Sequence, residues 1–283
     1  MKNIIWLMTD QQRYDTTGVN GNKTIRTPVL DMLSREGVNF RNAYSVYPLC
    51  CLARGSILTS RYPHHCIPGH QFPLPQNQRT VAHVFSECGY NTFYCGKWHV
   101  AGIQEEKQEI PIGRCIAPRE LRRGFETWLG YENNNAQYEC FLHGHRKEQE
   151  IPLFRLKGYE TDALTDLFLQ EIRDRTHQGR PFFGVLSVQP PHDPYVAPPE
   201  RDTYHNVAGI QLPPGVPDVP GVREHAEVEY AGYCSMLENI DGNVGRVLEC
   251  LQELEIMDDT HLLFFSDHGD MQGAHGLFRK MTA

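Results

Sequence analysis

Four short stretches of the chain place carboxylate, imidazole and ammonium side chains directly after apolar runs. These are the groups with which proteins bind cations and move protons. The recurrence is more informative than any one stretch, because each apolar run reads as a strand that ends where the polar groups begin. The stretches are Asp10-Gln11-Gln12-Arg13, Gly96-Lys97-Trp98-His99, Pro190-Pro191-His192-Asp193-Pro194 and Asp267-His268-Gly269-Asp270.

Three of these side chains form a candidate site for a divalent cation: Asp10, Asp267 and His268. Carboxylate oxygens suit calcium, magnesium or manganese, and an imidazole tilts the choice toward manganese or a softer ion. Taken alone, Asp10 could cap a turn after its strand, and His268 could be a packed loop histidine. Their joint placement at strand ends favours the metal site.

The elements that must position these groups predict an α/β fold, with a mostly parallel sheet sandwiched by helices. In an open parallel sheet, ligands bind beyond the carboxyl ends of the strands, so the four stretches should meet at one edge. Long loops are expected at 101–122 and 190–222, where lids or binding loops often occur. Strands are expected at 3–9, 90–95, 182–189 and 260–266, and helices after Thr27-Pro28 up to Gly37, at 80–88, at 160–175 and in a long segment ending near Leu254.

The segment from Pro48 to Arg61 has a cysteine, Cys50, four residues before an arginine, Arg54, and a Leu-Thr pair follows. It resembles the signature of the sulfatase family, in which that cysteine is oxidised to formylglycine. The resemblance runs from Asn3 to Lys280. It is supported by Thr27-Pro28-Val29-Leu30-Asp31 with Glu36-Gly37-Val38, by Gly96-Lys97-Trp98-His99, by Ser266-Asp267-His268-Gly269 and by Gly273-Ala274-His275-Gly276-Leu277-Phe278-Arg279-Lys280.

The resemblance implies an alkaline-phosphatase-like catalytic domain over residues 1–283 and a sulfuric ester hydrolase. Members of the family usually continue into a smaller C-terminal subdomain with a short antiparallel sheet. The chain ends three residues after Lys280, so we expect a domain truncated at its C-terminal end.

The resemblance also implies the cofactors and partners. One divalent cation, Ca²⁺ by preference with Mn²⁺ or Mg²⁺ as alternatives, is held by Asp10, Asp267, His268 and the formylglycine derived from Cys50. The substrate would be the sulfate ester of a small molecule or saccharide. The expected protein partner is a formylglycine-generating enzyme.

Further roles follow from the same resemblance. Formylglycine hydrates to a diol; one oxygen attacks sulfur, and collapse of the other releases sulfate. Arg54 and Lys97 are expected to stabilise the diol oxygens, and His99 to be the base for the collapse. His192 and Lys280 are expected to bind the sulfuryl oxygens and help to protonate the leaving group.

Two positions depart from the family pattern. Leu52 stands where the signature usually has proline, two residues after the modified cysteine. Gln11 stands where a second acidic residue often follows the first, as in some phosphonate and phosphodiester hydrolases, so it is a candidate for orienting a ligand or touching substrate. Two alternatives therefore stay open: a phosphonate monoester or phosphodiester hydrolase on the same scaffold, and an inactive metal- or anion-binding homologue with Cys50 unconverted.

Other classes are excluded by spacing and composition. A cysteine phosphatase loop needs five residues between cysteine and arginine, which neither Cys50 nor Cys51 provides. A formal charge of −8 argues against a nucleic-acid partner, and no apolar stretch approaches membrane-spanning length. Nine cysteines without C-x-x-C spacing and an N-terminus without a signal-like apolar region predict a cytoplasmic protein with mostly reduced thiols.

Overall fold

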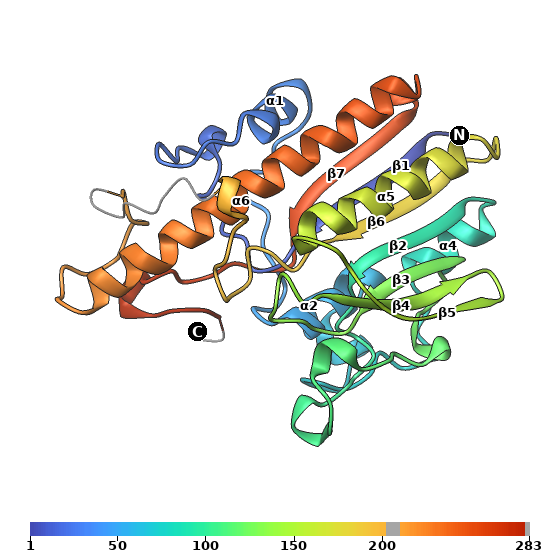
Figure 1. Ribbon diagram of the computed structural model, residues 1–283, viewed down its shortest axis with the longest axis horizontal. Helices are drawn as coiled ribbons and strands as arrows, with labels where there is room; N and C mark the ends of the chain where they lie inside the picture. Colours follow the sequence, from blue (N-terminus) through green and yellow to red (C-terminus); the bar gives the residue numbers. More distant parts are fainter. Residues whose placement is uncertain (202–209, 281–283) are drawn as a thin grey trace.

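A computed structural model describes residues 1–201 and 210–280, and its centre is a seven-stranded sheet in the order β5-β4-β3-β2-β6-β1-β7 (Figure 1). The β1, β2, β3, β6 and β7 strands run parallel, while β4 and β5 are antiparallel additions at one edge. The strands are β1 (Asn3–Thr9), β2 (Asn91–Lys97), β3 (Thr127–Tyr131), β4 (Phe141–Arg146), β5 (Gln149–Arg155), β6 (Phe182–Ser187) and β7 (Thr260–Ser266). The predicted mostly parallel α/β fold is confirmed.

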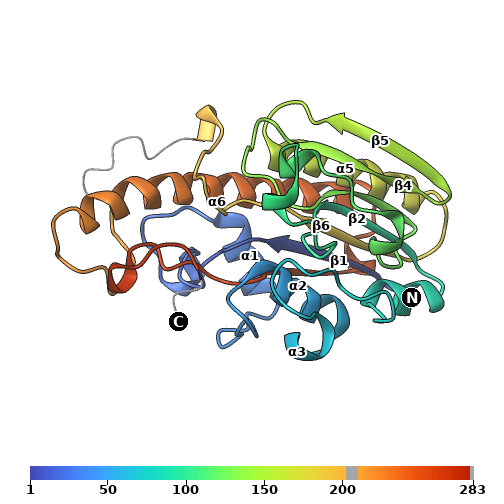
Figure 2. The same cartoon turned by 90° about the horizontal axis from the view of Figure 1, so that it is seen from below.

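The helices cover both faces of the sheet. The α-helices of the described residues are α1 (Pro28–Glu36), α2 (Cys50–Thr59), α3 (Pro63–Cys66), α4 (Val81–Glu87), α5 (Glu160–Thr176) and α6 (Val222–Glu253). Short 3₁₀ turns lie at Gly18–Asn20, Glu105–Lys107, Ile112–Arg114, Arg119–Leu121, Pro199–Arg201, Met257–Asp259 and Ala274–Gly276. Figure 2 shows α2 and α3 on the side of the strands opposite α5.

Successive side chains of β1 point to opposite faces of the sheet and pack into two separate cores, because both faces of this strand are buried. Ile5 and Leu7 belong to the core beneath α5 and α6. Ile4 and Trp6 pack against the second core, to which α2 contributes Leu52. The sheet is therefore held rigidly between two helical layers, and its strand ends are fixed in position.

The predicted helix boundaries match the local sequence signals. Helix α1 begins with Pro28 in its first turn, and Thr80 precedes α4 in a capping box with His83. The carboxylate of Asp241 in α6 accepts hydrogen bonds from the backbone N–H groups of Val29 and Leu30. The long helix thus anchors the first turn of α1.

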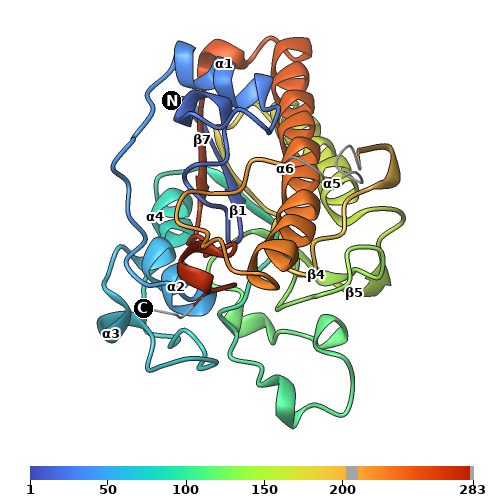
Figure 3. The ribbon, with the colours of Figure 1, turned by 90° about the vertical axis from the view of Figure 1, so that its left-hand side faces the viewer.

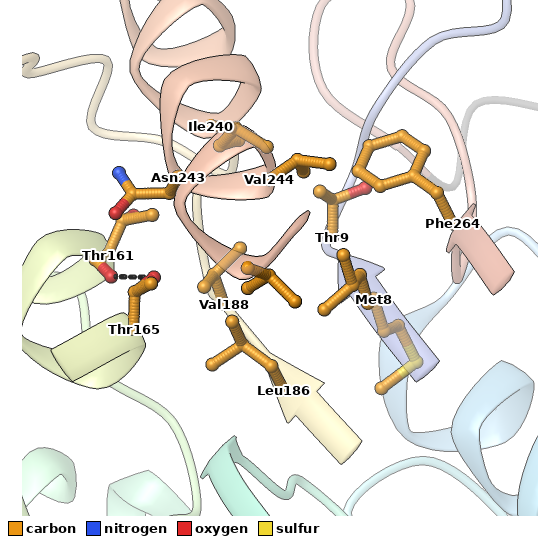
Figure 4. Close-up of a pocket in the computed structure, with 12 residues that line it drawn as sticks. Met8, Thr9, Thr161, Thr165, Leu186, Val188, Ile240, Asn243, Val244 and Phe264 are labelled. Carbon is orange, nitrogen blue, oxygen red and sulfur yellow. Dashed lines mark hydrogen bonds between the residues drawn. The ribbon is translucent and has the colours of Figure 1, made fainter. Parts of the chain in front are cut away.

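An apolar cavity of about 20 Å³ lies between α5, α6 and the strands β1, β6 and β7, which is room for about one water molecule (Figure 4). Met8, Leu186, Val244 and Phe264 line it, and Thr165 at its side donates its hydroxyl proton to the backbone carbonyl of Thr161. Its surface is almost wholly apolar, although Thr9, Thr161, Thr165 and Asn243 also line it, so we regard it as a packing gap.

The first predicted long loop lies within the described residues, and the second lies only partly within them. Residues 101–122 contain three 3₁₀ turns, and residues 202–209 of the second loop lie outside the described residues. The predicted strand at 90–95 is longer than expected, because β2 runs to Lys97. No helix in the described part of the chain combines the length and apolar character needed to cross a membrane.

Candidate active site

Four neighbouring strands, β2, β6, β1 and β7, deliver the chemistry-bearing stretches to one edge of the sheet. Because all four run in the same direction, their carboxyl ends lie side by side, and Figure 3 looks at the molecule from this side. Asp10 follows β1, Lys97 closes β2 and Asp267 follows β7. Helix α2 adds Cys50 as its first residue.

The four expected metal ligands meet in one buried cluster. One ligand atom from each of Asp10, Cys50, Asp267 and His268 lies within 4.8 Å of all the others. Cys50 Sγ is 3.4 Å from Asp10 Oδ1 and 3.1 Å from His268 Nε2. His268 Nε2 is 3.6 Å from Asp10 Oδ1 and 3.7 Å from Asp267 Oδ1.

The donor atoms of this cluster suit a cation. His268 Nδ1 lies 2.9 Å from the Gly269 carbonyl, which accepts the Nδ1 proton, so that Nε2 is the ring nitrogen directed at the carboxylates. Backbone N–H groups of Gln11 and His268 donate to Asp267 Oδ1. These contacts fix the ligand atoms before an ion arrives.

Arg54 lies beneath the two carboxylates and bridges them. Its Nε donates to Asp267 Oδ2 at 2.9 Å and its Nη2 to Asp10 Oδ2 at 3.1 Å, while Nη1 donates to the Lys97 carbonyl and to Ser187 Oγ. The side chain is only 1% exposed. In this geometry each carboxylate uses Oδ2 for the guanidinium and turns Oδ1 toward Cys50 and His268.

Lys97 provides a second buried cation. Its Nζ is 2.7 Å from Asp10 Oδ2, but no contact of Nζ in the described residues has the geometry of a hydrogen bond. Burial alone would raise the pKa of Asp10, but Lys97, Lys280, His192 and Arg54 together hold it well below its ordinary value. An ammonium group carries three protons, so the pairing of Lys97 with Asp10 leaves others for an incoming oxygen.

Cys50 lies at the convergence of these charges. Burial and the Asp10 carboxylate act to raise the pKa of its thiol, but Lys97, His192 and His268 outweigh them, and the pKa is well below its usual value. The thiol is 1% exposed. A group at position 50 is thus both anionic in character and shielded from bulk water.

The other predicted catalytic residues surround the same point. His99, His192 and Lys280 all interact with the Cys50 side chain. His192 Nδ1 lies 2.7 Å from the Asp193 carbonyl. Burial lowers the pKa of His99 to about 4, and Nδ1 of this histidine has no hydrogen-bond partner in the described residues. A neutral His99 can accept a proton.

The Gln11 side chain is hydrogen-bonded at both of its polar ends. Its Oε1 accepts a 2.7 Å hydrogen bond from Lys280 Nζ, and its Nε2 donates to Asp270. Asp270 also accepts from the Tyr195 hydroxyl, and Arg279 lies against Tyr195. Gln11 therefore orients Lys280. Sequence reasoning placed Asp270 and Arg279 in motifs without assigning them a role, and it missed Tyr195. The second aspartate of the Asp-His-Gly-Asp stretch was the signal available.

Five further histidines of the chain lie outside the four-residue cluster. His143 and His145 are buried in β4, where His143 accepts from the Ala117 amide and His145 lies near the Phe125 carbonyl. His70 contacts Cys51. His64 and His65 are exposed on α3. Among these, only His70 reaches a neighbour of Cys50.

Two buried carboxylates beside the site were also missed: Glu132 follows β3, and Glu160 begins α5. Glu132 accepts from the backbone amides of Ala101 and Gly102, and so fixes the turn after His99. Glu160 accepts from the Gln189 amide, before the His192 loop. Both hold loops that carry candidate catalytic histidines.

These two carboxyls are expected to make the unfolding free energy fall as pH rises from about 4.5 to about 7. Burial, opposed by hydrogen bonds, raises the pKa of each to about 7 in the folded chain, against an ordinary value of 4.5. Between these values the folded state holds more protons than the unfolded state, so stability is present at the acidic end and lost toward neutral pH. Urea unfolding at several pH values measures the slope.

The variant Glu132→Gln should flatten this pH dependence, because its side chain does not titrate. The matched control is Glu139→Gln, since the Glu139 side chain is 60% exposed. Equal slopes for wild type and Glu132→Gln would contradict the assignment to Glu132.

Comparison with known proteins gives one consistent answer. The family profile named Sulfatase matches residues 2–281. The chain is 31% identical over 99% of its length to an ulvan-active sulfatase of Formosa agariphila, and 30% identical over 98% of its length to an arylsulfatase of Clostridium perfringens. It spans 53% and 65% of these relatives. A solved structure described as the sulfatase yidJ from Bacteroides fragilis superposes with a TM-score of 0.87 at 28% identity, over 97% of this chain and 63% of the other.

Proposed function

This chain belongs to the sulfatase family, and on that premise we propose that it hydrolyses a sulfate monoester through a formylglycine formed from Cys50. The observation that carries the proposal is the position of Cys50, whose Sγ lies 3.4 Å from Asp10 Oδ1 and 3.1 Å from His268 Nε2. An oxygen-bearing side chain at this position would face the cation ligands directly. The low exposure of the site supports the exclusion of bulk water from it.

The cation proposed for the site is Ca²⁺, with Mn²⁺ or Mg²⁺ as alternatives. It would be held by Asp10, Asp267, His268 and the residue at position 50. When bound, such a cation lowers the pKa of an oxygen it holds and polarises a sulfuryl oxygen. Arg54 would keep both carboxylates oriented.

The remaining charged side chains are proposed to manage protons and the sulfuryl group. Lys97 Nζ would donate to an oxygen at position 50, since it makes no well-formed hydrogen bond in the described residues. His99 is proposed as the base for product release, because a pKa of about 4 leaves its ring neutral near pH 7. His192 and Lys280 would bind sulfuryl oxygens and help to protonate the departing alcohol.

The proposed substrate class is a sulfated saccharide or a related small sulfate ester. The similarity to an ulvan-active sulfatase and an arylsulfatase supports this class. A site that combines Arg54, Lys97 and Lys280 around two carboxylates is suited to a cation and an anionic group together. The alternative, a phosphonate monoester or phosphodiester hydrolase, is favoured by Gln11 and His268.

A formylglycine-generating enzyme is proposed as the partner that converts Cys50. Because Cys50 is 1% exposed and Leu52 packs in the second core, the folded chain offers neither residue to another protein. Conversion would therefore precede folding of this segment. Since none of the nine cysteines forms a disulfide, we also propose a reducing compartment, with the cytoplasm as the first candidate.

The proposal is tested with converted chain, verified by the intact mass of the Cys50 peptide. Turnover of 4-nitrophenyl sulfate should exceed that of the matching aryl phosphonate. A preference for the phosphonate would instead select the alternative function. A chain from its natural host with an unmodified thiol and no turnover of either ester would select the inactive homologue.

Removal of the cation is expected to reduce sulfate ester turnover by at least about 10³-fold, because charge development at the sulfuryl group would lose its main stabilisation. The measurement is turnover after dialysis against EDTA, then after addition of Ca²⁺, Mn²⁺ or Mg²⁺. Recovery with one of these ions is expected. Full activity in EDTA would contradict a role for the cluster in holding a cation.

A further inference from the structure

We propose that the same chain with Cys50 left as a thiol is a four-ligand zinc site, so that oxidation of Cys50 changes the metal selectivity of the cluster. This inference deepens the proposed function and rests on it only for the claim that Cys50 is converted. The evidence is the geometry of the thiol form itself, in which Sγ points at the other ligands.

The distances between ligand atoms fit a small tetrahedral ion. Zinc holds sulfur, nitrogen and oxygen at about 2.0–2.3 Å, which places the corners of a tetrahedron about 3.3–3.8 Å apart. The separations of Cys50 Sγ from Asp10 Oδ1 and His268 Nε2 are 3.4 and 3.1 Å, and those of His268 Nε2 from Asp10 Oδ1 and Asp267 Oδ1 are 3.6 and 3.7 Å. These four of the six separations lie in or within about 0.2 Å of the tetrahedral range, and all six are at most 4.8 Å.

The donor types favour zinc over calcium more strongly than the distances do. A thiolate and an imidazole are ligands for zinc, whereas calcium takes six to eight oxygen atoms. The thiol form supplies oxygen from only Asp10 and Asp267 within this cluster. Replacing Cys50 sulfur by the oxygens of a hydrated aldehyde removes the softest donor and shifts the set toward hard cations.

The contacts behind the ligands match those of zinc sites. His268 Nδ1 faces the Gly269 carbonyl, and this orients Nε2. Arg54 and Lys97 hold the outer oxygens of the carboxylates and offset the charge of two carboxylates and a thiolate around one divalent ion. On binding, the thiol proton is released to solvent and a zinc–sulfur bond forms.

A consequence follows for unconverted protein. Unconverted chain lacks the proposed nucleophile, and zinc bound through Cys50 Sγ would occupy the cation site, from which calcium would displace it poorly. Unconverted chains would then form a metal-loaded pool that is inactive and stable.

The test uses unconverted chain, confirmed by intact mass, with Co²⁺ as a spectroscopic probe for zinc. One equivalent of Co²⁺ should give a near-ultraviolet sulfur-to-cobalt band and visible bands of four-coordinate cobalt. Stoichiometric Zn²⁺ should remove them, whereas Ca²⁺ in roughly a thousandfold excess should not. The variant Cys50→Ser should lose the near-ultraviolet band and bind Zn²⁺ about 100-fold more weakly.

The matched control is Cys51→Ser. Cys51 is as buried as Cys50, but its sulfur contacts His70 and is no member of the cluster. This variant should keep the cobalt spectrum. Melting temperatures of both variants with EDTA show that each is folded.

The inference would be overturned by displacement of Co²⁺ by Ca²⁺ at up to roughly a thousandfold excess, by absence of the sulfur band in the unsubstituted thiol form, or by a sulfur band that survives in Cys50→Ser. Its failure is distinct from failure of the proposed function, which is measured on converted chain with a sulfate ester. Zinc selectivity of the thiol form, together with a converted chain that does not turn over sulfate esters, would support the zinc site and refute the proposed hydrolysis of sulfate esters.

Discussion

Replacing Cys50 by alanine is expected to reduce sulfate ester turnover by at least about 10⁴-fold, with little change in the fold. The proposed nucleophile derives from this side chain, and no neighbouring group can take its place. Cys51 Sγ lies against His70, outside the cation cluster. The measurement is the initial rate with 4-nitrophenyl sulfate in saturating Ca²⁺, against wild type whose conversion has been quantified by mass.

The size of this effect depends on the rest of the site being intact, which a control can establish. Cys51→Ser removes a neighbouring buried thiol without touching a cluster ligand, so it should keep turnover within a few-fold of wild type, scaled to its own degree of conversion. Circular dichroism and melting temperature show whether either variant is misfolded. A folded Cys50→Ala variant that retains substantial turnover would refute formylglycine chemistry at this position.

Replacing Arg54 by methionine is expected to lower the unfolding free energy in EDTA by about 3–5 kcal/mol. The guanidinium is 1% exposed and is hydrogen-bonded to both Asp10 and Asp267, which are themselves buried. Without it, two like charges face each other in a medium of low polarity, and Ser187 and the Lys97 carbonyl lose a donor. The large cost is that of leaving buried charges uncompensated.

Urea unfolding of wild type and Arg54→Met measures this difference. Saturating Ca²⁺ should recover part of the loss, because a divalent ion between the carboxylates replaces some of the missing positive charge. Arg79→Met is the matched control: Arg79 pairs with Glu87, both side chains are about 60% exposed, and the change should cost less than about 1 kcal/mol. Equal losses of unfolding free energy in the two variants would show that the ion pairs of Arg54 stabilise the fold no more than an exposed ion pair does.

Much of the fold could be predicted from local sequence. The strands β1 and β7 were placed at their observed bounds, because apolar runs flanked by polar residues are a local signal. The strands β3, β4 and β5 were missed. The β4 strand carries His143 and His145, whose partners lie in loops, and Arg146, which pairs with Glu171 of α5; β5 is an edge strand with exposed positions. Burial there depends on the tertiary structure, and periodicity does not reveal it.

The candidate site shows the same division at the level of single residues. Asp10, Lys97 and Asp267 could be identified as candidate site residues from the sequence, because each lies at or directly after the end of a strand. Glu132 could not be found this way, because its strand β3 was itself missed. Gln11 was recognised as a candidate, but the direction of its side chain could not be predicted. The residue has φ +69, and its side chain turns toward Lys280 and Asp270.

The sequence by itself determined the kinds of groups available: two carboxylates, an imidazole, a thiol and several cations, each tied to a strand end or helix start. It could not determine which atoms face one another. Arg54 joins Asp10 and Asp267 only because parallel pairing of β1 with β7 brings positions far apart in the chain into register. Register and helix docking are set by burial of both sheet faces, which is a property of the whole core, and for that reason the geometry of the cluster emerged only in three dimensions.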